Sequence, residues 1–117
     1  MGLEDIQTNL PLTETTFFIL LSLASSEKHG YAIAKDVESL SNHQVLLITS
    51  TLYTALKRLL ENGWIVRSGE DPEPDESGRP RKTYTLTDLG RRILEAEAAR
   101  LKSLVKAAKL RSVGEQA

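Results

Sequence analysis

The chain has 117 residues, 40% of them hydrophobic and 26% charged, and a formal net charge of −1, which is the composition of one ordinary globular domain. It contains no cysteine, so disulfides and thiolate metal sites are excluded. No apolar run approaches the ~20 residues of a membrane span, and the first residues hold neither a basic leader nor an apolar block, so we expect no signal peptide and a cytoplasmic protein.

Residues 1–11 are expected to form an N-terminal arm, because Pro11 stops regular structure before it. Thr13 and Glu14 then open a helix that is apolar on nearly every side from residue 17 to residue 24. A helix that is hydrophobic all round either lies at the centre of a domain or has partners on two faces. The second partner is either the core of the same chain or another subunit.

A polar break at residues 25–30 precedes a second helix, which begins at Tyr31 and has apolar residues at helical spacing up to Leu40. His29 in this break is open to two interpretations, a ligand or base and a local capping residue. A metal site needs several ligands, and the only other histidine, His43, lies beyond the second helix. We therefore favour capping or packing for His29, and we expect no metal and no cofactor.

The chain's central segment, residues 49–63, predicts an amphipathic helix. Thr49 or Ser50 is expected to cap its start, and Asn62-Gly63 to close its end. The preceding residues 45–48 are expected to be a short extended segment or apolar filler that seats this helix. Its buried stripe is predicted at Leu52, Ala55, Leu56, Leu59 and Leu60.

The opposite face of this helix donates hydrogen bonds or carries positive charge, and no acid appears in it before Glu61. Such a face suits the major groove of DNA, and the helix-turn-helix layout of residues 31–63 places it as the second, recognition helix. The alternative is an ordinary solvated face. The residues predicted to face the major groove are Ser50, Thr51, Tyr53, Thr54, Lys57 and Arg58.

Two short strands are predicted next, at residues 64–67 and 81–86, around a loop at residues 68–80. A hairpin that follows a recognition helix is a wing. Arg79, Arg81 and Lys82 are predicted to bind phosphates there, the alternative being a solvated basic strand. The acidic stretch at residues 70–76 would be repelled by DNA, so we expect it to point away from the backbone or to be disordered. Trp64 is interpreted as a core residue.

Thr87-Asp88 is predicted to cap a long last helix that runs from about Leu89 toward Val113. Residues 94, 101 and 108 lie seven apart, as in a coiled-coil seam. A second copy of the chain is the expected partner of this helix, and the alternative is that the helix folds back on its own domain. The predicted dimer interface comprises Phe17, Phe18, Leu94, Ala98, Leu101, Leu104, Val105 and Ala108.

Four stretches of the chain, taken in order, resemble the PadR family of bacterial transcriptional regulators, and in particular its smaller subfamily with a single C-terminal helix. One departure is Ile48-Thr49, where the family often has Ser-Pro before the recognition helix. The stretches are residues 12–14 with 19–23, His-Gly-Tyr at 29–31 with 33–34, residues 51–53 with 55–59 and 62–65, and residues 78–82 with 84, 86–87 and 90.

The resemblance implies a dimeric repressor that binds operator DNA and is relieved by a small hydrophobic or aromatic effector. It also implies that Tyr31 lies near the DNA backbone or braces the helix-turn-helix motif. The expected fold is mainly α with a small β-hairpin, in three parts. These are the arm (1–11), a winged helix-turn-helix domain (12–86), and a C-terminal dimerisation helix and tail (87–117).

Two other classes of function are alternatives to a DNA-binding regulator. A winged helix that binds protein and not DNA would fit the near-neutral charge and the acidic loop. An enzyme has little support, because no nucleophile, base and orienting residue stand at a recognisable spacing and no glycine-rich phosphate loop is present.

Overall fold

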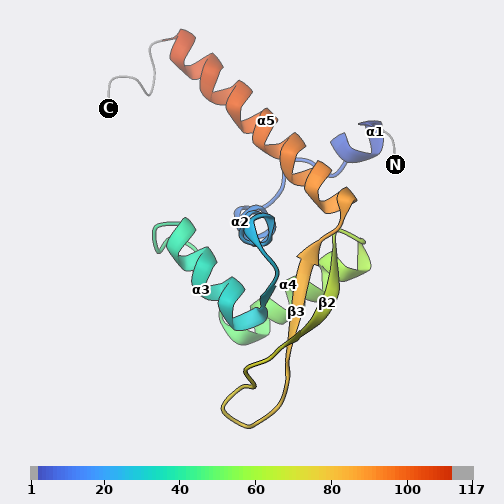
Figure 1. Ribbon diagram of the computed structural model, residues 1–117. Coiled ribbons are helices and arrows are strands. Elements are labelled where there is room, and N and C mark those ends of the chain that lie inside the picture. Colours follow the sequence, from blue (N-terminus) through green and yellow to red (C-terminus); the bar gives the residue numbers. More distant parts are fainter. Residues whose placement is uncertain (1–2, 112–117) are drawn as a thin grey trace.

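The computed structural model describes residues 3–111. A helical body carries a β-hairpin that projects on one side, and the last helix extends away on the other (Figure 1). The expected mainly α fold with a small β-hairpin is confirmed. The elements are α1 (Leu3–Gln7), α2 (Glu14–Ser25), β1 (Lys28–His29), α3 (Gly30–Leu40), α4 (Thr49–Glu61), β2 (Ile65–Asp71), β3 (Arg81–Leu86) and α5 (Asp88–Leu110).

Three helices begin at side-chain caps that lie where the sequence predicts them. Thr13, His29 and Thr87 each accept a hydrogen bond from the backbone N–H three residues further on, at 3.1, 3.1 and 3.0 Å. His29 uses its Nδ1 atom for this bond, so its interpretation as a capping residue is confirmed.

The start of α4 differs from the prediction. Its N-cap is Ile48, which makes no side-chain cap hydrogen bond, so the expected cap by Thr49 or Ser50 is wrong. Helical geometry begins at Thr49 itself, which places both hydroxyls inside the first turn instead of in front of it. The end is as predicted, because Asn62 is the C-cap and Gly63 has a φ of 75°.

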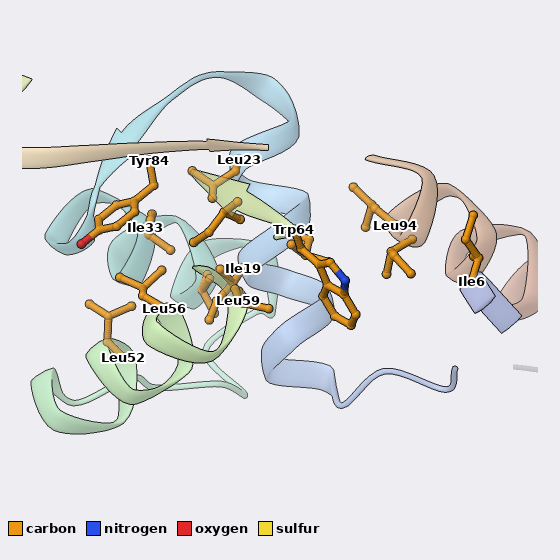
Figure 2. Packing of buried hydrophobic residues seen from close by; sticks show 14 residues of the cluster. Ile6, Ile19, Leu23, Ile33, Leu52, Leu56, Leu59, Trp64, Tyr84 and Leu94 are labelled. Atoms are coloured by element: carbon orange, nitrogen blue, oxygen red, sulfur yellow. The ribbon is translucent and has the colours of Figure 1, made fainter. Parts of the chain in front are cut away.

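The core joins one face each of α2, α3 and α4 to the sheet. Figure 2 shows Leu52, Leu56 and Leu59 of α4 on the side that meets Ile19 and Ile33, which confirms the buried stripe predicted for this helix. Burying that stripe turns the opposite face of α4 outward. The buried hydrophobic residues are Ile6, Ile19, Leu20, Leu23, Ile33, Val37, Leu52, Leu56, Leu59, Trp64, Ile65, Tyr84, Ile93 and Leu94.

The expected N-terminal arm contains regular structure. Helix α1 packs against α5, and its Ile6 is buried beside Leu94 (Figure 2). Just before α2, the backbone N–H of Leu12 donates to Oε2 of the buried Glu97 at 2.7 Å. Two contacts thus hold the N-terminal segment on α5, and neither partner is near it in sequence.

The sheet has three antiparallel strands in the order β1-β3-β2. Strand β1 was not predicted from the sequence, and β2 continues four residues beyond its predicted end at residue 67. Both extra segments exist because β3 offers backbone partners that local sequence does not reveal. The register pairs Lys28 with Tyr84 on one side and Arg67 with Tyr84 on the other, and a bulge between Arg67 and Gly69 lets β2 continue to Asp71.

The junction between α4 and α5 is closed by backbone contacts. Thr87 donates its N–H to the carbonyl of Trp64 at 3.1 Å and its hydroxyl to the carbonyl of Gly63 at 2.6 Å. Trp64 is buried, as predicted. Gly90 passes so close to Trp64 that a Cβ there would lie 1.9 Å from the Trp64 carbonyl oxygen. These contacts fix the direction in which α5 leaves the domain.

Helix α5 divides into two halves. The first half packs on α1, α2 and the sheet, with Ile93, Leu94 and Glu97 buried. The second half leaves the body of the domain (Figure 1), so only the first half follows the alternative in which the helix folds back on its own domain. The predicted end near Val113 lies outside the described residues. No helix within residues 3–111 combines the length and the apolar character needed to cross a membrane.

Candidate nucleic-acid interface

All six residues predicted to face the major groove are exposed on one side of α4. By helical spacing, Tyr53 lies at one border of this side and Arg58 near the other, with Ser50, Thr54 and Lys57 between them. We call the set Ser50, Thr51, Tyr53, Thr54, Lys57 and Arg58 the polar face of α4. Its hydroxyls, amine and guanidinium offer the hydrogen bonds that base edges and phosphates accept.

The phenol of Tyr53 occupies space that a glycine leaves free. A Cβ on Gly30, the first residue of α3, would lie 2.8 Å from the Tyr53 hydroxyl oxygen and 3.4 Å from Leu52. The phenol therefore packs directly over the start of α3. This contact gives a structural reason for glycine in the His-Gly-Tyr sequence at residues 29–31.

The start of α3 carries a cluster of aromatic and charged groups. The rings of His29 and Tyr31 stack with centroids 6.4 Å apart. The Arg81 guanidinium lies 5.8 Å from the centre of the Tyr31 ring, and Lys35 Nζ lies 5.4 Å from it. Tyr31 is still 59% exposed, so the predicted backbone-contacting tyrosine is presented outward between two cations.

Two members of this cluster were not predicted as site residues. Lys35 lies four residues after Tyr31, which is the helical spacing that places two side chains on one face, so the sequence held a usable signal for it. Asp71 Oδ2 lies 3.6 Å from His29 Nε2, and Arg81 Nη1 lies 3.3 Å from the same nitrogen. This contact depends on the extension of β2 and on β1, and no local pattern indicated it.

The three basic residues that were predicted to bind phosphates in the wing differ in how exposed their side chains are. Arg79 and Lys82 are exposed, whereas Arg81 is half-buried against His29 and Tyr31. The register of the hairpin sets Glu70 opposite Lys82 and Asp71 opposite Arg81. Opposite charges across a strand pair stabilise a hairpin, which gives part of the acidic stretch a role within the wing.

The tip of the wing differs from the expectation. Asp75 and Glu76 do not turn away, because they line a hollow of about 630 Å³ together with Tyr31, Tyr53 and Lys82. The Asp75 carboxylate closes the loop by accepting from the N–H and hydroxyl of Ser77 and the N–H of Arg79. The Ser77 hydroxyl, followed by the Arg79 N–H, holds the pKa of Asp75 below its usual value.

Tyr84 lies beneath this hollow and is buried in the core. Burial and then the neighbouring Tyr53 raise the pKa of its phenol, while Arg67 acts in the opposite direction. The phenol of Tyr84 therefore stays neutral. No group of three or more His, Asp or Glu side chains within residues 3–111 is placed to hold a metal ion.

The residues predicted to form a dimer interface fall into two groups. Leu94 is buried within its own chain, and Phe17 and Phe18 are half-buried on α2 with their rings edge to face. The other predicted residues lie in the extended half of α5 or just before it. Among them, Leu104 is 55% and Val105 is 54% exposed. The exposed or half-exposed members on α5 are Ala98, Leu101, Leu104, Val105 and Ala108.

The sequence also matches a known protein family over most of its length. The model of the transcriptional regulator PadR-like family matches residues 19–96. An uncharacterised 37.1 kDa protein in transposon Tn4556 of Streptomyces fradiae is 40% identical over 85 residues, which are 73% of this chain. The chain spans only about a fifth (22%) of the length of that relative.

The solved structures that resemble the chain include two PadR proteins with more than a quarter of their aligned residues identical to it. One is a PadR family transcription regulator from Clostridium difficile R20291, with 26% identity and a TM-score of 0.67 over 84% of this chain and 97% of that one. The other is Bacillus subtilis PadR in complex with operator DNA, with 27% identity and a TM-score of 0.58 over 69% of this chain and 44% of that one.

Proposed function

Because the chain belongs to the PadR-like family of transcriptional regulators, we propose that it represses transcription by binding operator DNA as a homodimer. The polar face of α4 enters the major groove, and the wing and the start of α3 hold the phosphate backbone. The protein acts in the cytoplasm, where bacterial DNA is found.

One observation carries this proposal. Three elements, α3, α4 and β3, bring tyrosine hydroxyls and the cations Arg81 and Lys82 to the same side of the domain, where the wing loop adds the acids Asp75 and Glu76. Tyr31, Tyr53 and Lys82 line a single hollow there, and Lys35 adjoins it through its contact with Tyr31. A face that reads base edges needs such flanking contacts, because phosphate contacts set the orientation of the protein on the duplex.

Dimerisation is proposed on the basis of the extended half of α5. Leu101, Leu104, Val105 and Ala108 follow the spacing of three and four residues that defines one helical stripe, and this stripe has little cover from its own chain. A second copy of α5 would bury it. The dimer would then present two α4 helices to half-sites about one helical turn (~34 Å) apart.

We further propose that a small hydrophobic or aromatic effector relieves repression by binding between the subunits, beside Phe17 and Leu101. In the single chain Phe17 is half-buried and Leu101 is 36% exposed, so both leave apolar surface for a ligand. Such an effector acts only if it favours a dimer geometry in which the two α4 helices no longer match the half-sites.

The reading surface is tested by removing two of its exposed cations. We expect Lys57→Ala with Lys82→Ala to weaken DNA binding at least about tenfold, because each lost phosphate or base contact costs on the order of 1 kcal/mol. Arg81 is a poorer choice, since it also supports Tyr31. Binding is measured by fluorescence anisotropy with a duplex from the chain's own upstream region.

The matched control is Lys102→Ala with Lys106→Ala, which removes the same charge from exposed positions of α5. If both double variants lose affinity equally, the effect is one of net charge and the assignment of the polar face fails. If neither variant loses affinity, the assignment of the polar face also fails, whereas a winged helix that binds protein and not DNA would leave even the wild-type chain without affinity for the duplex.

A further inference from the structure

The segment between α3 and α4 exposes two large aliphatic side chains. Residues 45–48 alternate, so that Val45 and Leu47 pack against the core while Leu46 and Ile48 are 66% and 68% exposed. Alternation of this kind is what an extended segment lying on a core produces. Packing within the chain therefore does not explain why the two outward side chains, Leu46 and Ile48, are apolar.

An isoleucine at position 48 makes the fold less stable than a polar residue would, in two ways. As the N-cap of α4 it supplies no acceptor to the free N–H groups of the first turn, which serine, threonine, aspartate or asparagine would do. It also leaves most of a β-branched apolar side chain in water. A polar residue would remove both costs, so isoleucine here points to an apolar partner outside the chain.

The position of Ile48 identifies that partner. Ile48 shares a groove of about 510 Å³ with Tyr31, Lys35, Thr49 and Tyr53, so it adjoins the border of the polar face of α4. The start of a recognition helix is the part that contacts base edges. In the major groove the one apolar group on those edges is the C5-methyl of thymine.

We propose that Ile48 reads a thymine methyl group at the base pair nearest the start of α4. This inference rests on the proposed function and adds a determinant of sequence preference to it. Lys35 and Glu38 line the same groove, and Lys35, which contacts the Tyr31 ring, supplies the cation that an adjacent phosphate requires. Double-stranded DNA, with a thymine methyl group near a phosphate, complements an apolar side chain beside a cation, whereas a purely apolar peptide does not.

The test selects duplexes from a random library with the purified full chain, and repeats the selection with Ile48→Ser and with Leu46→Ser. We expect the wild-type chain to enrich a motif with thymine at one position of each half-site. Ile48→Ser should bind but lose that preference alone. Leu46→Ser removes an equally exposed aliphatic residue that lines the same groove but stands three positions before α4, and it should enrich the wild-type motif.

A second arm changes the DNA and not the protein. Replacing the selected thymine by uracil removes only the methyl group. We expect this change in one half-site to weaken wild-type binding about fourfold, the effect of burying one methyl group, and to leave Ile48→Ser unchanged. The thermal midpoint of Ile48→Ser should not fall, because serine is able to cap α4.

The outcomes separate the inference from the proposed function. If the wild-type chain enriches no motif, the proposed function fails and the inference fails with it. If it enriches a motif that Ile48→Ser shares in full, or if uracil binds as well as thymine, DNA binding stands and the role of Ile48 is refuted. Loss of the thymine preference with Leu46→Ser also refutes it, because the contact would then not be specific to the start of α4.

Discussion

At the scale of single residues, the closest packing around any of the described glycines lies where α5 begins beside Trp64. Gly90 leaves no room for a side chain there, because the nearest obstacle is the backbone carbonyl of Trp64 and not a movable side chain. We expect Gly90→Ala to lower the free energy of unfolding by roughly 3 kcal/mol, as overpacking does when the backbone must shift. Urea denaturation measures this change.

The control for Gly90 is its exposed neighbour Arg91, where alanine should change stability by less than about 0.5 kcal/mol. An unaltered urea midpoint for Gly90→Ala would contradict the close approach of α5 to Trp64. The direction in which α5 leaves the domain would then need another cause.

Glu97 supplies a second prediction at this scale. Its side chain is 2% exposed, and Arg100 Nε donates to it at 2.5 Å. The bond from Arg100, together with that from the Leu12 N–H, holds the pKa of Glu97 below its usual value, although burial opposes this. A lowered pKa in the folded state stabilises the fold above the ordinary carboxyl pKa, and this contribution is lost as the pH falls through the folded-state pKa.

We therefore expect Glu97→Gln to be less stable than the wild-type chain near neutral pH, with the difference shrinking as the pH falls below the ordinary carboxyl pKa and through the lowered pKa of the folded state. Thermal melts across this range measure it. Glu95→Gln, at an exposed position of the same helix, should show no comparable change with pH. If the stability difference between Glu97→Gln and the wild-type chain stays constant down to the lowest pH, the carboxylate acts through packing and not through its charge.

At the scale of elements, the amphipathic helices could be predicted from sequence because their signals are local. Thr13, His29 and Thr87 each mark a helix start within three residues of the bond they make. The cap of α4 was mispredicted because serine and threonine follow each other there, and spacing does not say which residue precedes the first turn.

The elements that could not be predicted from sequence depend on distant partners. Strand β1 has only two residues and pairs with β3, which is more than 50 positions away. Helix α1 is held by α5 at the other end of the chain. For the site, the polar face of α4 could be predicted, whereas the contact of Asp71 with His29 required the full register of the sheet.

The extended half of α5 yields a prediction about assembly. Leu104→Glu places a charge in the middle of the exposed apolar stripe and should convert the proposed dimer to a monomer, because burying an unpaired carboxylate is costly. Sedimentation velocity measures the change. Ser103→Glu adds the same charge to another side of the helix and should leave the dimer intact.

Two results would contradict this role of α5. If the wild-type chain sediments as a monomer, the stripe has another role. If Ser103→Glu dissociates the dimer as readily as Leu104→Glu, the interface does not lie on the stripe.

At the scale of the whole molecule, near-neutral net charge and DNA binding are compatible because the charge is segregated. The β3 cations Arg81 and Lys82 lie on the surface that they share with Tyr31 and Tyr53, and part of the acidic stretch lies opposite these two bases across the hairpin. Fields between exposed charges are screened within ~10 Å at moderate salt, so the local surface matters more than the total. The molecule is thus organised around α4, with its apolar back in the core and its polar face outward.

The most direct test compares binding of the purified chain to its own upstream region and to a scrambled duplex, at about 50 mM and 200 mM salt. We predict tighter binding to the upstream duplex and a steep loss of affinity with salt, since several phosphates are neutralised. Equal and weak binding to both duplexes would contradict the assignment of α4 and the wing as a surface that recognises DNA sequence.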